Sequence, residues 1–584
     1  MRVPGQRGFE SQLLRDGVVD EPQLVRAQSH AADKGVSLAE AVVACGFAPA
    51  DLVYRSLAGH CGYRYVVPSR VAIPPALAQK VPARFATHYR FVPIEDRDGL
   101  LVAAVSNPLD TQLLDDIRVV LKCRVETVVA TPAEIDRATK ALYGVGAQTV
   151  ERLLSDADSA GRVVDLETVE TGADLGDESI DPSIIKFVNE LIAEAIANGA
   201  TDIHVEPFED QLRVRYRIDG ILHGVPTPPS IRGLHAAIVS RVKIMANLDI
   251  AERRMPQDGK IRAALGDERF DLRVSILPTP HGETVNLRIL NRSSMFLTLE
   301  QLGFQPGDLE RFNAFVRNPH GMILLTGPTG SGKTTTLYAA LSKLNRLEHK
   351  IITIEDPIEY QLHGITQMEV LPRIGFSFTT ALRSMLRHDP DIMLVGEIRD
   401  YETAEMAVRS SLTGHLVFST LHTNDAAGAV TRLTDMGVEP FLIASTMIAC
   451  IAQRLVRVVC EGCAERYEPD PEVLARFGWR PEAFDSAEFR RGRGCDACRN
   501  TGFSGRMAIY EILPFTAPIQ RMTVERRPST AIKKKACQLG MRTLRESGWD
   551  LVRQGRTTLE EVARVTAEAD LPALEETGDA TLPV

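Results

Sequence analysis

The sequence GPTGSGKTT, residues 327–335, follows the apolar run 322–325 and precedes the helix-forming run 336–341. It satisfies G-x-x-x-x-G-K-[ST] in the strand, loop and helix context of a phosphate-binding loop. Its glycines let backbone N–H groups converge on phosphate oxygens, and the helix N-terminus adds partial positive charge. A glycine-rich structural turn is the alternative, which the flanking elements disfavour. The residues expected to contact a nucleoside triphosphate are Gly327, Pro328, Thr329, Gly330, Ser331, Gly332, Lys333, Thr334 and Thr335, with Lys333 on the β- and γ-phosphates and Thr334 on Mg²⁺.

Four apolar segments around this loop are expected to be strands. They are MILLT from residue 322, KIITI from 350, DIMLV from 391 and HLVFS from 415. Helix-like segments such as 378–387 and 401–411 separate them. Continuous apolar strands alternating with helices predict a parallel sheet covered on both faces, with its ligand at the strand ends. We therefore predict a multidomain α/β protein.

Hydrolysis of the triphosphate also needs carboxylates and groups that stabilise developing charge. The strand DIMLV ends in Gly396, so its first acid is Glu397, and ITIEDPIEY offers Glu355 at the end of the preceding strand. Taken singly, each acid could be a solvated loop end. His422 follows the fourth strand on the ligand edge and can donate a hydrogen bond to a phosphate oxygen. His415 lies at the opposite end, where a structural contact is the simpler explanation.

Length and composition restrict the function classes. The 584 residues are too many for one core, and 44% hydrophobic with 25% charged residues is typical of a soluble protein. We find neither a membrane-spanning run nor a signal peptide, so we expect a cytoplasmic protein. The net charge of -10 argues against nucleic-acid binding. Residues 151–181 carry ten acidic side chains against two arginines and are predicted to be a flexible linker, with a solvated loop as the alternative.

Four of the nine cysteines form two C-x-x-C pairs separated by 31 residues. Two such pairs complete a tetrahedral sulfur site suited to Zn²⁺. Four protein ligands leave no open position, so the metal would be structural. Redox activity is the alternative, but the context is not thioredoxin-like. The predicted zinc ligands are Cys460, Cys463, Cys495 and Cys498.

The order of these motifs resembles the secretion ATPase superfamily, the RecA-type hexameric motors of type II secretion and type IV pilus assembly. GPTGSGKTT, ITIEDPIEY, HDPDIMLVGEIRD and TGHLVFSTLHTN are similar to its Walker A, Asp-box, Walker B and His-box motifs. The resemblance extends upstream through ATDIHVEPFEDQLRVRYRIDG and AERRMPQDGKIR, and downstream through QRLVR and the cysteine pairs, over about residues 182–515. The stretch NDAAGAVTRLTDMGVEPFLI most resembles type II secretion motors.

The resemblance implies roles for individual residues. Glu397 would be catalytic, Glu355 would share in positioning water or metal, and His422 would approach the γ-phosphate. The small domain before the motor would supply arginines to the phosphates as the two domains close. By motif these are Arg215, Arg217 and, across an apparent one-residue insertion, Arg232. A solvated basic strand face is the alternative for Arg215 and Arg217.

The resemblance also implies a domain order. We expect an N-terminal α/β docking domain at 1–145, an acidic linker at 146–181, a small α+β (PAS-like) domain at 182–295, a RecA-like ATPase domain at 296–455, a tetracysteine zinc module at 456–515, a C-terminal helical region at 516–566 and a disordered tail at 567–584.

The function expected from the resemblance is a cytoplasmic Mg²⁺-dependent ATPase. It would form a homohexamer, be recruited indirectly to the inner membrane through its N-terminal domain, and drive assembly of pseudopilus subunits through a platform protein. A pilus-assembly ATPase is the alternative; a weakly hydrolysing adaptor and a nucleic-acid motor are less favoured. Some relatives bind cyclic-di-GMP through a paired helical motif containing Arg-Leu-Gly. The corresponding places here, 8–10 and 37–39, lack the arginine, so we expect no tight binding.

Overall fold

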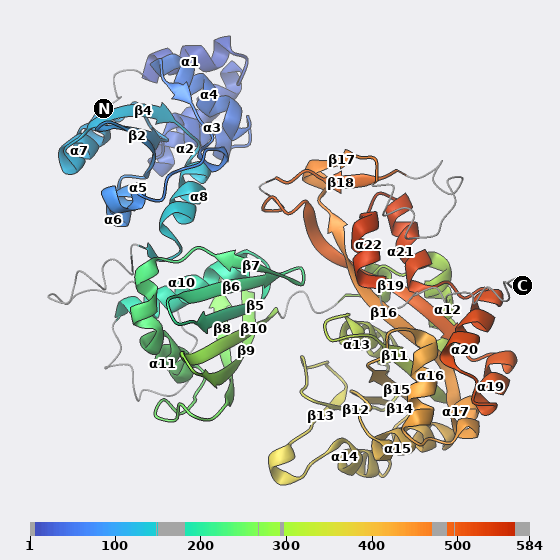
Figure 1. Cartoon of the computed structure of the whole chain (residues 1–584). Coiled ribbons are helices and arrows are strands. Elements are labelled where there is room, and N and C mark those ends of the chain that lie inside the picture. Colours follow the sequence, from blue (N-terminus) through green and yellow to red (C-terminus); the bar gives the residue numbers. More distant parts are fainter. Residues whose placement is uncertain are drawn as a thin grey trace, which may run out of the picture. The chain divides into compact units, whose positions relative to one another are not determined.

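The computed structural model describes residues 6–147, 149, 182–266, 268–291, 297–469, 488–495 and 497–566. The chain divides into two compact units, Met1–Leu290 and Asn291–Val584 (Figure 1). The expected linker, apart from residues 146, 147 and 149, and the expected tail lie outside the described residues. Among the described helices, none is long and apolar enough to cross a membrane.

The first unit begins with four helices, in which α4 packs against α1 and α3, and α3 also packs against α2. Their apolar faces meet around Phe9, Leu13 and Tyr54, which are fully buried. A small sheet in the order β1-β4-β3-β2 follows, with further helices against it. The elements are α1 (Gln6–Arg15), α2 (Glu21–Lys34), α3 (Leu38–Ala44), α4 (Ala50–Cys61), β1 (Arg64–Tyr65), α5 (Leu77–Lys80), α6 (Ala83–His88), β2 (Phe91–Arg97), β3 (Leu100–Val105), α7 (Thr111–Leu121), β4 (Arg124–Val129) and α8 (Pro132–Tyr143).

The second part of this unit is a six-stranded sheet in the order β7-β6-β5-β10-β9-β8, with α10 and α11 packed against it. Alternate residues of β6, namely Leu212, Val214 and Tyr216, enter the core with these helices. Because side chains alternate along a strand, the intervening arginines lie on the other face. The elements are α10 (Pro182–Ala197), β5 (Ala200–Pro207), β6 (Leu212–Ile218), β7 (Ile221–Val225), η3 (Pro229–Leu234), α11 (His235–Met245), β8 (Gln257–Leu265), β9 (Glu268–Thr279) and β10 (Gly282–Asn291).

The second unit is built on a seven-stranded sheet in the order β13-β12-β14-β15-β11-β16-β19. Neighbouring strands from β13 to β16 pair in parallel, and β19 pairs antiparallel with β16. The predicted parallel sheet is thus confirmed. The strands are β11 (Gly321–Thr326), β12 (Ile351–Glu355), β13 (Thr366–Glu369), β14 (Ile392–Val395), β15 (Leu416–Leu421), β16 (Met447–Val459) and β19 (Phe503–Pro514).

Helices cover both faces of this sheet (Figure 1). Ile323 and Leu325 of β11 pack with α12 and α13 on one face, whereas Met322 and Leu324 face the core formed with α14, α15 and α16. Both faces of β11 are therefore buried, which explains its uninterrupted apolar sequence. The helices are α12 (Pro306–Val316), α13 (Lys333–Leu344), α14 (Phe378–Met385), α15 (Tyr401–Leu412), α16 (Ala426–Asp435), α17 (Pro440–Thr446), α19 (Ala517–Val524), α20 (Ser529–Gln538), α21 (Leu544–Arg553) and α22 (Leu559–Thr566).

The cysteine module lies between two strands of the motor sheet. β16 runs past the expected boundary at residue 455, and β19, expected within the module, is the edge strand of the sheet. The motor sheet therefore includes strands from the range 456–515 that we expect for the zinc module, and the boundaries of 296–455 and 456–515 stay a prediction. β16 and β19 pair antiparallel although the cysteine module lies between them in the sequence. A local sequence pattern does not reveal such a long-range pairing. A two-stranded sheet, β17 (Ala464–Arg466) with β18 (Arg490–Gly492), belongs to the module itself.

A buried ion-pair cluster holds the last helix against the sheet. Glu561 of α22 has a side chain only 1% exposed and accepts from Arg457 of β16 at 2.8 Å and from Arg564 at 2.7 Å and 2.9 Å. Burial by itself would raise the pKa of Glu561, but the hydrogen bonds from Arg564 and Arg457 outweigh it and lower the pKa to about 2. Because an unfolded glutamate titrates near about 4.3, the ionised form stabilises the folded state.

We predict that Glu561→Gln lowers the free energy of unfolding by on the order of 3 kcal/mol at neutral pH. The pKa is lowered on folding, so the contribution is complete above about pH 4.3 and falls to about half near pH 3. Urea unfolding followed by tryptophan fluorescence measures this, since both tryptophans lie in the second unit.

The matched control is Glu402→Gln, which removes an exposed ion pair with Arg383 and should change stability by less than about 0.5 kcal/mol. A difference between Glu561→Gln and the parent that stays constant from pH 7 to pH 3 would contradict the assignment.

Candidate functional site

The expected site elements meet at one edge of the motor sheet. Because β11, β12, β14 and β15 run in parallel, their carboxyl ends lie on the same edge. Hydrogen bonds fix the turns that follow: Gly396 N–H donates to the Ile354 carbonyl at 2.8 Å, and Ile398 N–H donates to the Thr420 carbonyl at 3.0 Å. The loop bearing Glu397 is thus held between the ends of β12 and β15.

The phosphate-binding loop connects β11 to α13. Gly332 is the N-cap of α13 and, with φ of 86°, occupies the left-handed region that favours glycine. Lys333 Nζ donates to the carbonyl oxygens of Gly327 and Pro328 at 2.7 Å and 3.1 Å. Within the described residues, the buried hydroxyl of Ser331 has no hydrogen-bond partner. Burial lowers the pKa of Lys333 to about 8, while the Glu397 carboxylate acts in the opposite direction. An anion bound in the loop would therefore favour its charged form.

Glu397 contacts two cationic or ionisable groups. Its Oε1 forms an ion pair with Arg399, and its Oε2 lies 3.3 Å from His422 Nε2. Arg399 also reaches Asp356 Oδ2 at 3.7 Å. The Glu397 side chain is 16% exposed, and the His422 side chain is 49% exposed. The structure therefore brings together Glu397 and His422, which the sequence analysis had assigned separately to the ends of two strands.

The loop carrying His422 is tied to the phosphate-binding strand. Thr423 N–H donates to Thr326 Oγ1 at 2.9 Å, and the two threonine hydroxyls lie 2.6 Å apart. On its other side, Arg454 donates to the Asn424 carbonyl at 2.9 Å. His415 lies at the opposite end of β15 and contacts the Ser410 carbonyl at 2.8 Å. This position fits the structural contact expected of it.

Glu355 ends β12 but points into the protein. It is 4% exposed and accepts hydrogen bonds from Tyr338, from Thr353 at 2.6 Å and from Gln367 at 3.1 Å. Burial raises the pKa of its carboxyl, and these hydrogen bonds act against the rise. The sequence placed Glu355 at the correct strand end, but not its enclosure by side chains of α13 and β13.

The predicted arginines lie in the first unit. Arg215 makes a two-pronged ion pair with Glu206 at 2.7 Å and 2.8 Å. Arg217 donates to the Gly220 carbonyl at 3.0 Å, and its Nε lies 3.8 Å from Asp202. Arg232 lies in η3, and in the part of the chain that the structure describes its buried Nε has no hydrogen-bond partner.

The four predicted zinc ligands form one cluster. Their sulfur atoms all lie within 4.8 Å of one another. Sγ···Sγ distances are 3.8 Å for Cys460 to Cys495, 3.7 Å for Cys463 to Cys498 and 3.7 Å for Cys495 to Cys498. These distances are far from the roughly 2 Å of a disulfide. The structure thus confirms that the two C-x-x-C pairs converge on a site that could hold a metal ion.

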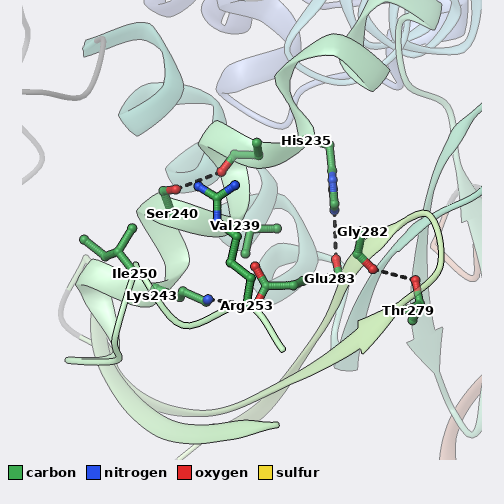
Figure 2. Close-up of a pocket in the computed structure, with 10 residues that line it drawn as sticks. His235, Val239, Ser240, Lys243, Ile250, Arg253, Thr279, Gly282 and Glu283 are labelled. Atoms are coloured by element: carbon green, nitrogen blue, oxygen red, sulfur yellow. Dashed lines mark hydrogen bonds and ion pairs between the residues drawn. The ribbon is translucent and has the colours of Figure 1, made fainter. Parts of the chain in front are cut away.

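A separate hollow of about 150 Å³ lies in the first unit, between α11 and the β9–β10 turn (Figure 2). Lys243, whose side chain is 1% exposed, pairs there with Glu283 at 2.7 Å and donates to the Glu252 carbonyl at 2.7 Å. His235 Nε2 contacts the Glu283 carbonyl at 2.8 Å. These polar groups bond to one another within the unit, so we assign the hollow no catalytic role.

Sequence reasoning missed several groups at the nucleotide loop. Arg399 lies two residues after Glu397 in the motif HDPDIMLVGEIRD. Its ion pair with Glu397 depends on how the chain turns after β14, which the sequence does not show. Gln453 of β16 accepts from the Thr336 hydroxyl at 2.9 Å, and its carbonyl lies 2.6 Å from where a Cβ on Gly327 would stand. Gln453 and Arg454 belong to the QRLVR segment that the resemblance includes. No local sequence pattern predicts their contacts with the nucleotide loop and with the loop of His422.

Comparison with known proteins identifies the family of this chain. Residues 177–564 match the family described as type II/IV secretion system protein, and residues 61–149 match the MshEN domain. The chain belongs to the type II/IV secretion system protein family. It is 40% identical to the type IV pilus assembly ATPase PilB of Myxococcus xanthus over 95% of this chain and 98% of that protein. It is 41% identical to type II secretion system protein E of Xanthomonas campestris, with 95% and 98% covered. The type II secretion system ATPase E of Vibrio cholerae is 42% identical, with 86% and 100% covered.

Membership confirms the predicted family, the multidomain α/β fold and the enzyme class. The chain is an ATPase of the secretion and pilus-assembly type. The geometry agrees with this class, because the phosphate-binding loop and the pair Glu397 and His422 share one sheet edge. Membership of an ATPase family implies a nucleotide and Mg²⁺.

We predict that Gly327→Ala weakens binding of a fluorescent ATP analogue by roughly tenfold or more, a loss of about 1.4 kcal/mol per factor of ten. A Cβ there would lie 2.6 Å from the backbone oxygen of Gln453, and its φ of 150° disfavours other residues. The loop would have to move away from β16.

Gly414→Ala is the matched control, because Gly414 precedes β15 and lies outside the loop 327–335. Its φ is 103°, and a Cβ there meets nothing within 4 Å. The substitution should cost about 1–2 kcal/mol of backbone conformational energy, equally with and without nucleotide, and leave affinity nearly unchanged. Equal affinities for the two variants would contradict this account of the loop.

Proposed function

We propose that this chain is the hexameric cytoplasmic ATPase of a type II secretion system, which drives assembly of pseudopilus subunits through an inner-membrane platform. The observation that carries the proposal is the meeting of the phosphate-binding loop with Glu397 and His422 at one sheet edge. The sequence after His422, which resembles type II secretion motors, favours that system. Residues 1–145 would dock the motor on membrane proteins, so its recruitment to the inner membrane is indirect.

The hydrolytic step assigned to the site is attack of water on the γ-phosphorus of ATP. Glu397 would accept the proton from water while the bond to the departing ADP oxygen breaks. Lys333 and the loop N–H groups would hold the β- and γ-phosphates, and His422 would donate to a γ-phosphate oxygen. Thr334 would ligate Mg²⁺, which when bound neutralises phosphate charge. The Ser331 hydroxyl, which has no hydrogen-bond partner among the described residues, supports a polar ligand in the loop.

Glu355 is retained as the assisting carboxylate of this proposal. Its oxygens are bonded to Tyr338, Thr353 and Gln367. To orient water or metal directly it would have to exchange one of these partners. Burial raises the pKa of the Glu355 carboxyl and so favours its protonated form. A cation such as Mg²⁺ close to Glu355 would favour the ionised form instead.

Arg215, Arg217 and Arg232 are proposed to reach the phosphates when the small domain closes on the motor. The buried Nε of Arg232, which has no partner among the described residues, supports its assignment. Arg215 would first have to leave Glu206, with which it makes two hydrogen bonds. Guanidinium groups are suited to this task because they stay charged and bind phosphate with two donors.

A pilus-assembly motor is the second candidate system. The Myxococcus xanthus pilus ATPase is as similar to this chain, at 40% identity, as the Xanthomonas campestris secretion protein at 41%. A chromosomal Lys333→Ala strain separates the two. Loss of secreted enzymes with normal pili supports type II secretion, and loss of surface pili with normal secretion supports pilus assembly.

We predict that Glu397→Gln lowers ATP turnover by roughly 10²- to 10⁴-fold, the range for a lost general base. The purified full chain should still bind ATP, since Lys333 and the loop N–H groups proposed to hold the phosphates are kept. Phosphate release and equilibrium binding of an ATP analogue measure the two effects.

Glu348→Gln, at an exposed position after α13, serves as the control and should turn over ATP normally. Near-normal turnover of Glu397→Gln would remove Glu397 from the mechanism. Turnover that is negligible in the parent chain, even with membrane partners, would favour the nucleotide-dependent adaptor, and stimulation by single-stranded DNA would favour a nucleic-acid motor.

The cysteine cluster is proposed to bind one structural Zn²⁺. Tetrahedral zinc with Zn–S bonds of about 2.3 Å places its sulfurs about 3.8 Å apart. Three of the six Sγ···Sγ distances, at 3.7 to 3.8 Å, fit that requirement. Four thiolates leave no site for substrate, so the ion would stabilise the module between β16 and β19.

We predict about one zinc per purified chain by elemental analysis, and loss of most of it in Cys463→Ser, because three sulfurs bind the ion more weakly than four. Cys537→Ser, at an exposed cysteine outside the cluster, should keep the metal. Chelation should also expose the module to proteolysis. A zinc-free parent chain whose protease resistance is unaffected by chelation would disprove the assignment.

A further inference from the structure

A fully buried carboxylate, Glu511 of β19, connects two helices near the nucleotide edge. It is 0% exposed. Its Oε1 accepts from the backbone N–H of Ala426, the first residue of α16, at 2.9 Å, and its Oε2 accepts from Leu544 N–H, the first residue of α21, at 3.4 Å. Both contacts place negative charge at a helix N-terminus, where it is favoured. One side chain thus fixes the starts of α16 and α21 relative to each other.

Lys533 of α20 supplies positive charge to this carboxylate. Its Nζ lies 3.6 Å from Glu511 Oε2 and 3.4 Å from Asp425 Oδ2, and its side chain is 15% exposed. Asp425 is the N-cap of α16 and accepts from Gly428 N–H at 2.8 Å through its other oxygen. Lys533 therefore lies between two carboxylates that both hold the first turn of α16.

The first turn of α16 directly follows the loop that carries His422. Only residues 423–425 separate His422 from Ala426. The start of this loop is fixed to β11 by the hydrogen bonds between Thr423 and Thr326. Its end is fixed by the contacts that Glu511 and Lys533 make with Ala426 and Asp425. Across so short a segment, movement of α16 must change the path of the backbone at His422.

We propose that Lys533 and Glu511 are positioning residues for ATP hydrolysis, which hold the loop of His422 through the N-terminus of α16. This inference rests on the proposed function, because the role of His422 in hydrolysis is itself part of that proposal. It adds that the C-terminal helices α20 and α21 set the geometry of the nucleotide edge. Both residues belong to elements outside the loop 327–335, Glu511 to β19 and Lys533 to α20, and both would act on catalysis through His422.

Removing the charge of Lys533 takes away a cation that pairs with the carboxylates of both Asp425 and Glu511. Like charges at close range repel, and a buried carboxylate without its partner recruits water or a proton. Either change displaces the start of α16. A displacement of about 1 Å in a positioning element can lower a rate by about 10²-fold. The phosphate-binding loop belongs to β11 and α13, so ATP affinity should be kept.

The test is a double-mutant cycle on the full chain, with phosphate release as the readout. Lys533→Met should lower kcat roughly ten- to a hundredfold and leave KM for ATP within about twofold. Lys533→Arg, which keeps the charge, should restore most of kcat. In a His422→Ala background Lys533→Met should have little further effect, since the residue through which it acts is gone.

Lys534→Met is the matched control, because Lys534 is the exposed neighbour of Lys533 on α20. It should keep the parent kcat. Thermal unfolding establishes that each variant is folded. If Lys533→Met does not fold, Glu511→Gln replaces it. Its amide oxygen can still accept from Ala426, which favours folding, while loss of its charge removes the attraction to Lys533 and should lower kcat in the same way.

The remaining outcomes separate the two proposals. The kcat losses of Lys533→Met and His422→Ala could multiply in the double variant, which would mean that the two residues act independently. That result, or a parent-like kcat in folded Lys533→Met, would overturn the positioning role and leave the proposed function standing. Full activity of His422→Ala would remove His422 from the proposed mechanism and overturn the positioning role with it.

Discussion

Parallel pairing of β12, β14, β15 and β11 is the constraint on which the site depends. Because the four strands run in one direction, the segments after residues 326, 355, 395 and 421 emerge at one edge. Helices on both faces keep the strands apolar and leave the polar residues to the turns. The nucleotide loop, Glu397 and His422 are therefore neighbours in space although about 90 residues separate the first from the last.

Buried carboxylates hold this edge and the C-terminal region together. Glu355, Glu511 and Glu561 are each at most 4% exposed, and each accepts several hydrogen bonds. Burying a charge is unfavourable unless it is paired, so each must keep its partners. Glu561 has two arginines and a lowered pKa, whereas Glu355 has neutral donors and a raised pKa. The same residue type thus serves as a fixed anion in one place and as a readily protonated group in another.

The sequence predicted the parts of the protein that depend on local pattern. The loop 327–335, the strands around it, the arginine strand β6 and the two cysteine pairs were all placed correctly, because spacing and alternation identify them. The enclosure of Glu355 was missed, since Tyr338 and Gln367 come from other elements. The extent of the motor sheet was missed for a similar reason: β19 joins β16 across the whole cysteine module.

The sequence by itself thus determined the family and the ATPase class, because these follow from short motifs in a fixed order. Only the tertiary structure decided which side chains meet the motif residues. Arg399 on Glu397, Gln453 against Gly327, and Lys533 with Glu511 at the start of α16 are contacts between segments brought together by strand pairing and helix packing. Such contacts leave no periodic signal in the chain, since each partner alone resembles an ordinary polar residue.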